Sequence, residues 1–259
     1  MRPLLALLAA ALCCAAPALA DGLPVLGIDV GSTGVASLTA RYLTVPDGPA
    51  TLLLVVQPNG GRIWEWRRLR GALTIPAVAY DGSAAGLSAD GSTLVLIQPR
   101  RAFPRATTRL VVLGTGRLRV RRTIDLDGDY SFDAISPRGR LVYLIHYLSV
   151  ADPSRYEVRT YDLRHARLLP KPVTVPGEQM RGKPLSRAST RDWAYTLYDG
   201  NGQTPFVHAL HTTTATARCL DVDALRGRDL NGLVLRLDGH GLAVRRGSET
   251  IATVSLTEP

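Results

Sequence analysis

A short pattern recurs five times between Val45 and Leu242: an apolar stretch, a polar turn built on or beside Asp-Gly, and a second apolar stretch. The clearest copies are GLSADGSTLVLI at 86–97 and AISPRGRLVYLI at 134–145. Placing the turns at Asp47, Asp90, Arg138, Arg191 and Asp238 separates them by about 43 to 53 residues. Repeats of this length are typical of small sheets arranged around an axis.

Strand signals dominate the chain, and helix signals are nearly absent. The predicted strands are short, rich in β-branched or aromatic residues, and bounded by Gly, Pro, Asn or Asp. They cover 51–56, 72–80, 94–98, 108–113, 118–126, 141–147, 156–163, 194–198, 206–210, 217–222 and 233–237. Within 117–121, three arginines alternate with Leu118 and Val120, so we expect the arginines on one face and the apolar pair on the other. Four strands per repeat match a propeller blade.

The two ends of the chain predict how the sheets close. The last unit has room for three strands, at 233–237, 242–246 and 250–256. Segment 23–30 precedes the first unit's entering strand at 41–45 and has no partner of its own. We therefore expect an all-β, five-bladed β-propeller of four-stranded antiparallel blades, with the N-terminal strand closing the C-terminal blade and so removing two sheet edges.

The turn motifs also carry a resemblance. The segments SADGSTLV at 88–95 and SPRGRLVY at 136–143 resemble the Ser-Pro-Asp-Gly turn of bacterial propeller repeats of the YVTN, TolB-like and WD40-like types. The segment YEVRTYDL at 156–163 is similar to the third strand of such a blade. The resemblance implies the fold more strongly than a function, because these repeats serve as binding platforms in most families and as enzyme frames in a few.

Residues 1–20 read as a secretory signal peptide with a cut after Ala20, since Arg2 precedes a short apolar segment and a small-residue site follows. The expected mature protein is a single propeller domain at 21–259, secreted or extracytoplasmic, monomeric and without a transmembrane segment. It would retain one cysteine, Cys219, and we expect that residue to be a buried strand residue that forms no intrachain disulfide.

The charge of the chain points to anionic partners. The formal net charge is +9, or +8 without Arg2, and nearly all of it is arginine. Such a charge favours association with acidic polymers or lipid head groups, although an evenly solvated surface is the plainer interpretation.

Candidate site residues come from aligning the five turns. The alignment places Tyr42, Ala85, Asp133, Ser186 and Val234 at one inner-strand position, with Arg187 beside Ser186. Tyr42, Asp133, Ser186 and Arg187 are therefore the candidate binding residues of a central channel. Asp133 and Arg187 are also expected to suit a structural ion pair, because a buried charge needs a partner.

A second candidate site is aromatic. Trp64 and Trp66 lie two residues apart beside Arg68, so they form either an aromatic surface that stacks on a ring or a core between blades.

No pattern in the chain predicts a catalytic nucleophile, a metal site or a cofactor. We therefore expect a non-enzymatic binding or scaffold module for a protein or an anionic envelope polymer, and no nucleic acid partner. The alternative is an extracytoplasmic enzyme acting on a carbohydrate or a lactone at the central channel, with Asp133 as its polar anchor.

Overall fold

The computed structural model describes residues 34–58, 61–239 and 241–256, and this part of the chain is built from eighteen strands and three short 3-10 turns. The first two sheets contain β1 (Val35–Ala36), β2 (Arg41–Asp47), β3 (Ala50–Val56), β4 (Ile63–Arg70), β5 (Thr93–Ile97), β6 (Thr107–Gly114) and β7 (Arg119–Asp127). The next two contain β8 (Tyr130–Ile135), β9 (Leu141–Tyr147), β10 (Tyr156–Asp162), β11 (Arg167–Leu168), β12 (Pro184–Ser189), β13 (Trp193–Tyr198), β14 (Phe206–His211) and β15 (Thr216–Asp221). The last contains β16 (Val234–Asp238), β17 (Gly241–Arg246) and β18 (Glu249–Ser255). The 3-10 turns are η1 (Thr115–Arg117), η2 (Gly200–Gly202) and η3 (Asp223–Leu225).

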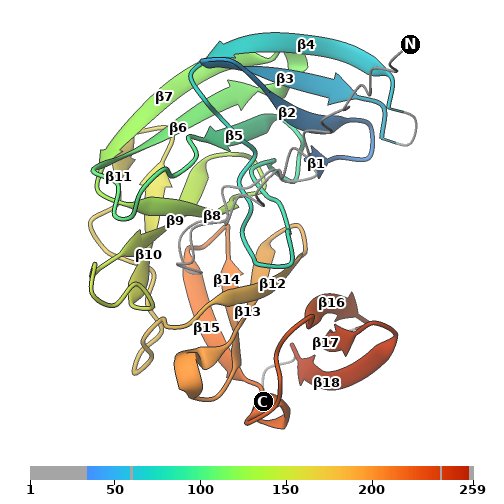
Figure 1. Cartoon of the computed structure of the whole chain (residues 1–259), viewed down its shortest axis with the longest axis vertical. Helices are drawn as coiled ribbons and strands as arrows, with labels where there is room; N and C mark the ends of the chain where they lie inside the picture. Colours follow the sequence, from blue (N-terminus) through green and yellow to red (C-terminus); the bar gives the residue numbers. More distant parts are fainter. Residues whose placement is uncertain (1–33, 59–60, 240, 257–259) are drawn as a thin grey trace, which may run out of the picture.

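The strands form five antiparallel sheets, each of three or four strands taken consecutively from the chain. Sheets β1–β4, β8–β11 and β12–β15 have four strands, whereas β5–β7 and β16–β18 have three. Figure 1 shows these sheets following one another along an arc, from β1–β4 at the top to β16–β18 at the lower right. The predicted all-β, propeller-like fold is confirmed by this sheet architecture.

Apolar side chains hold each sheet against the next. One buried cluster joins Leu53 of β3 to Leu113 of β6, and comparable clusters join the second sheet to the third, the third to the fourth and the fourth to the fifth. In the third sheet, Val142 and Leu144 contribute to the cluster with the second sheet, whereas Tyr143 and Ile145 contribute to the cluster with the fourth. This alternation along β9 is the strand period of two, with both faces buried.

The predicted alignment of the first unit is wrong by one strand. The hydrogen-bonded turn that matches the one at Ser88 begins at Ser37, whose N–H bonds to the carbonyl of Ala40 at 2.8 Å, and not at Asp47. The inner edge of the first sheet is therefore β1, and Tyr42 lies on β2, the second strand. The sequence alignment placed the first turn at Asp47 because Asp-Gly is the stronger turn signal.

The predicted strand at 72–80 is also wrong. Only isolated bridges form there, from Thr74 to Ile97 and from Ala77 to Ala84. The segment is a short hairpin whose tip crosses to the fourth sheet, where the N–H groups of Tyr80 and Asp81 bond to the carbonyls of Pro184 and Leu185 at 2.9 and 3.1 Å. Figure 1 shows this loop, in teal, descending from β5 toward β12.

The alternation expected at 117–121 holds only in part. Leu118 is fully buried, but it sits in a left-handed turn before β7 rather than on the strand. A bulge between Val112 and Leu113 shifts the register of β6 against β7, and Val120 is 37% exposed. The bulge breaks the period of two, so the apolar pair does not share one buried face.

The last unit has the three strands predicted for it, and 23–30, the segment expected to complete it, lies outside the described residues together with the predicted signal peptide at 1–20. Within the described part of the chain, no helix has the length and apolar character needed to cross a bilayer.

Candidate functional site

Turns from four consecutive sheets lie next to one another at one end of the strands. The β-carbon of Ser37 is 4.0 Å from where a β-carbon on Gly91 would lie, and the Asp90 N–H bonds to the Pro137 carbonyl at 2.9 Å. The Tyr143 hydroxyl then bonds to the Thr212 carbonyl at 2.9 Å. These contacts join the inner turns of the first three sheets to one another, and they join β9 of the third sheet to the β14–β15 turn of the fourth.

The outer turns of the sheets join the same surface. Thr115, in the β6–β7 turn, donates its hydroxyl to the Gly91 carbonyl at 2.6 Å, and the Leu163 N–H bonds to the Arg140 carbonyl at 2.9 Å. In the fourth sheet, the Thr212 N–H bonds to the Asp192 carbonyl at 2.7 Å. Antiparallel pairing forces this proximity, because alternate turns of a meander fall at the same end of the sheet.

Exposed arginines gather on this surface. We call them the arginine rim, and they are Arg117, Arg119, Arg121, Arg138, Arg140, Arg164, Arg167 and Arg191. None of the eight forms an ion pair with another residue that the structure describes. A rim of this kind offers solvent-facing guanidinium groups for an anion.

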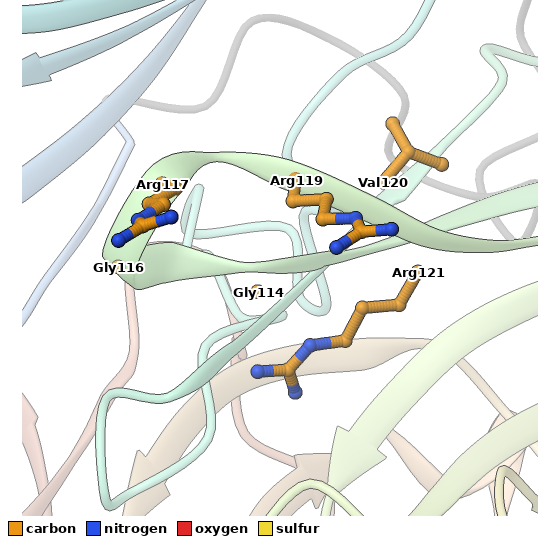
Figure 2. Close-up of a pocket in the computed structure, with 6 residues that line it drawn as sticks. All are labelled: Gly114, Gly116, Arg117, Arg119, Val120 and Arg121. Atoms are coloured by element: carbon orange, nitrogen blue, oxygen red, sulfur yellow. The ribbon is translucent and has the colours of Figure 1, made fainter.

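One hollow of the rim, of about 620 Å³, lies at the β6–β7 turn and is lined by Arg117, Arg119, Arg121 and the backbone of Gly114 and Gly116. Figure 2 shows Arg117 at the end of the hairpin, Arg119 further along the ribbon, and Arg121 reaching past Gly114. A β-carbon on Gly114 would lie 2.5 Å from Nε of Arg121, so a larger residue there would displace this guanidinium. Three positive charges thus border one open hollow.

A second hollow, of about 410 Å³, lies between the third and fourth sheets. Arg138, Arg140 and Arg191 line it, together with Ser136, Pro137, Leu141, Asp192 and Thr213. The two hollows belong to adjoining turns, so the positive surface extends over the ends of three sheets.

The aspartates within these turns are engaged by neighbouring groups. Asp90 accepts hydrogen bonds from the Ser88 hydroxyl at 2.6 Å and the Ser92 N–H at 3.0 Å. Asp162 accepts from the backbone of Arg164 and from Nδ1 of His165 at 2.7 Å, and the hydrogen bond to His165 lowers its pKa. The carboxylates therefore hold the turns in shape, whereas the arginines stay exposed.

The predicted pair of Asp133, on β8, and Arg187, on β12, is brought together between the third and fourth sheets. The Arg187 guanidinium bonds to the Asp133 carboxylate, and the two side chains are only 6% and 4% exposed. A carboxylate already bound by a buried guanidinium suits the structural ion pair better than an anchor for a carbohydrate or a lactone.

Ser186 is fully buried and also takes part in structural contacts. Its hydroxyl donates to the carboxylate of Asp81 at 2.5 Å and accepts from the Leu235 N–H at 2.8 Å. Ser186 thus ties the hairpin tip at 81 and the fifth sheet to β12. Tyr42, 6% exposed, packs between the first two sheets, and burial raises the pKa of its hydroxyl.

His208 lies beside the buried ion pair. It is 2% exposed, and burial lowers its pKa to about 4, with Asp133 acting to raise the pKa and Arg187 to lower it. In the unfolded chain the pKa is about 6.5, so from about pH 6.5 down to 4 only the unfolded chain takes up the proton.

This difference in pKa predicts that His208 lowers the free energy of unfolding in acid. The contribution is complete above pH 6.5 and is lost as the pH falls toward 4, by about 3 kcal/mol in the free energy of unfolding. Urea unfolding at several pH values measures it, with His208→Gln as the comparison. Equal pH dependence in the two proteins between pH 6.5 and 4 would contradict the assignment.

Trp64 and Trp66 lie on the outer strand β4 and are 52% and 62% exposed. Of the two interpretations, the described residues therefore favour an aromatic surface over a core between blades. Cys219 is partly buried on β15, and burial raises the pKa of its thiol to about 12, with Glu178 and Asp221 adding to the effect. Its thiol is therefore protonated at neutral pH.

In the described residues, no three His, Cys, Asp or Glu side chains are grouped as metal ligands. The arginine rim itself was not among the predicted sites. Arg138 and Arg191 were recognised as turn residues and 117–121 as an arginine-rich strand, but nothing in one unit indicates that the turns of different units touch.

Comparison with known proteins gives structural matches only. Neither a protein-family model nor a curated protein matches the sequence. Solved structures similar to this one include TolB from Acinetobacter baumannii, with a TM-score of 0.45 and 12% identity over 76% of this chain and 45% of that one. A functionally unknown protein from Desulfotomaculum acetoxidans has a TM-score of 0.48 and 12% identity over 83% of this chain and 62% of that one.

An uncharacterised protein from Listeria monocytogenes has a TM-score of 0.42 and 7% identity over 83% of this chain and 88% of that one. The chain thus spans less than two thirds of the first two structures. The expected resemblance to TolB-like propellers holds at the level of fold, as the chain's own succession of small antiparallel sheets already indicates.

Proposed function

We propose that this protein is an exported β-propeller scaffold whose arginine rim binds an anionic polymer of the cell envelope. The observation that carries the proposal is the set of eight exposed arginines, without ion-pair partners in the described chain, on turns that touch one another. The planar guanidinium forms paired hydrogen bonds with phosphate or carboxylate groups, so less side-chain entropy is lost for each bond formed, and a rigid scaffold adds little ordering cost of its own.

A polymer fits the rim better than a small ligand. The two arginine-lined hollows are separate, and the rim runs over the ends of three sheets. A chain of repeated negative charges can contact both hollows at once, and the second contact then costs little further loss of freedom. Release of the counterions condensed on such a polymer adds to the affinity and makes it depend on salt.

The direct test is a binding titration with two probes, long-chain polyphosphate and polyglutamate, followed by fluorescence anisotropy at several salt concentrations. We expect saturable binding to at least one probe, weakening steadily as salt rises. Absence of binding at low salt, or binding that does not change with salt, would overturn the proposal. Dextran of similar length is the uncharged control.

The scaffold is proposed to be a closed ring of five blades in one domain at 21–259, with segment 23–30 as the fourth strand of the last sheet. The length of the connection from residue 30 to β1 supports this proposal. Only two residues link β7, the outer strand of the second sheet, to β8, the first strand of the third sheet, and four residues lie between position 30 and β1, so a similarly short link would serve here. The sequence at 23–30 also supplies five apolar side chains, Leu23, Val25, Leu26, Ile28 and Val30, to cover the free edge along β18.

Closure makes a prediction about truncation. A protein that begins at residue 31 is expected to lose about 3 kcal/mol or more in the free energy of unfolding relative to one that begins at 21, because several apolar side chains lose their burial. Urea unfolding of the two proteins provides the measurement. A synthetic peptide of 21–30 should restore part of the lost stability, whereas equal stability of the two proteins would contradict closure.

A further inference from the structure

The outer strand of the first sheet carries an exposed surface that the proposed function does not use. In β4, every residue from Ile63 to Arg68 is exposed. Ile63, Trp64 and Trp66 are 52%, 52% and 62% exposed, which places three large apolar side chains in solvent on one edge strand. We define these three residues, with Arg62, Arg67, Arg68 and Arg70, as the β4 edge.

Local backbone geometry contributes to this exposure. β4 is the last strand of its sheet, so one side of its backbone has no neighbouring strand among the described residues. The pairing with β3 skips Trp64, because Val55 faces Glu65 and Val56 faces Ile63. A bulge at this place lets the extra residue turn away from the sheet.

The second sheet shows which outer-strand residues stay exposed when a sheet has neighbours. In the second sheet, which has neighbours on both sides, β7 is the corresponding outer strand. There Val120 is 37% exposed, and Thr123 and Asp125 are exposed too. Outer-strand residues that point back toward the preceding sheet thus stay in solvent even in a flanked blade, and the same is expected for Trp66.

Charge surrounds the apolar side chains. Arg62, Arg67, Arg68 and Arg70 are all exposed, and Arg68 bonds to Asp47 with Nε 2.6 Å from the carboxylate. With Glu65 and Asp47 counted, four positive charges stand against two negative ones. Such a strand is poorly suited to adding another strand, since charged side chains along an edge discourage pairing.

Tryptophan, an aliphatic side chain and arginines together match the boundary of a lipid bilayer. Tryptophan rings reside at the depth of the head groups, and arginine bonds to lipid phosphate. A sugar-binding platform needs the flat faces of aromatic rings, and it gives no role to Ile63 or to the excess of arginine. We propose that the β4 edge is a second interaction surface, which lays the propeller against an anionic phospholipid membrane.

The experiment uses the chain from residue 21 onward and vesicles of phosphatidylcholine with or without phosphatidylglycerol. The protein has three tryptophans, and we expect their emission to move to shorter wavelength only with the anionic vesicles. Cosedimentation should show binding that Trp64→Ser/Trp66→Ser weakens by at least about tenfold, since the buried apolar area is lost. Arg67→Ser/Arg70→Ser should weaken it by about fivefold for each arginine.

Two controls separate this surface from the rest of the molecule. Trp193→Phe removes the third tryptophan and should leave both the binding and the spectral shift in place. Arg138→Ser/Arg191→Ser alters the arginine rim and should leave vesicle binding largely unchanged. A negative vesicle result would therefore not count against polymer binding at the rim, which the polymer titration tests separately. The proposal is overturned if anionic vesicles do not bind, if the double tryptophan variant binds as well as the parent, or if only the rim variant loses binding. Equal urea midpoints confirm that each variant is folded.

Discussion

Replacing Asp133 with alanine is expected to cost about 3–5 kcal/mol in the free energy of unfolding. The reason is the Arg187 guanidinium, which is 6% exposed and bonds to Asp133 across two sheets. Its Nε has no hydrogen-bond partner among the residues that the structure describes, so the variant would leave a buried positive charge with its main partner gone. Urea unfolding at pH 7 measures the loss.

A double substitution distinguishes the effect of leaving Arg187 unpaired from the effect of losing the contacts of both side chains. In Asp133→Ala/Arg187→Met both charges are absent, and much of the stability should return, because a buried pair replaced by apolar side chains costs little. Asp125→Ala, which removes the exposed partner of Arg109, is the surface control and should change stability little. If Asp133→Ala unfolded at the same urea concentration as the parent, the pair would not be holding the third and fourth sheets together.

Replacing four arginines of the rim with serine should weaken polyphosphate binding by about two to three orders of magnitude, at about 1 kcal/mol for each arginine at an anionic surface. The variant is Arg117→Ser/Arg119→Ser/Arg138→Ser/Arg140→Ser, which depletes both hollows. All four side chains are exposed, so the fold should persist. Fluorescence anisotropy at fixed salt gives the affinity, and the salt dependence should become shallower at the same time.

The matched control removes positive charge elsewhere. Arg101 and Lys171 are exposed and lie outside the rim, so Arg101→Ser/Lys171→Ser should change affinity only through the net charge of the protein. Similar losses per charge in the two variants would mean that the whole molecule attracts the polymer. In that case, the rim would not be a site.

The strands were largely predictable because their pattern is local. The strand at 141–147 was predicted with its observed ends, since a β-branched and aromatic run is bounded by a turn on one side and a polar loop on the other. The turn at Ser37 was missed because its sequence, Ser-Leu-Thr-Ala, lacks the Asp-Gly that marks the turn at Asp90. A serine hydroxyl that bonds to the backbone also stabilises a turn, but it is a weaker indicator of a turn in the sequence.

The site was predicted less well because it depends on contacts between units. Aligning the turns correctly brought Asp133 and Arg187 to neighbouring positions, and the structure joins them. The same alignment failed for Tyr42, which lies one strand further out. The hairpin at Ala77–Ala84 pairs with β12 through backbone groups, which the sequence of neither segment indicates. The arginine rim exists only once the turns of three sheets have been placed side by side.

Hydrogen–deuterium exchange of the protein with and without polyphosphate tests the central claim most directly. Binding at the arginine rim predicts slower exchange in the turns at 88–93, 115–121, 136–141 and 190–193, which carry or adjoin the rim arginines. The loops at the other end of the strands, at 99–106 and 148–155, should exchange as before. Protection confined to those loops, or equal protection over the whole chain, would contradict the claim.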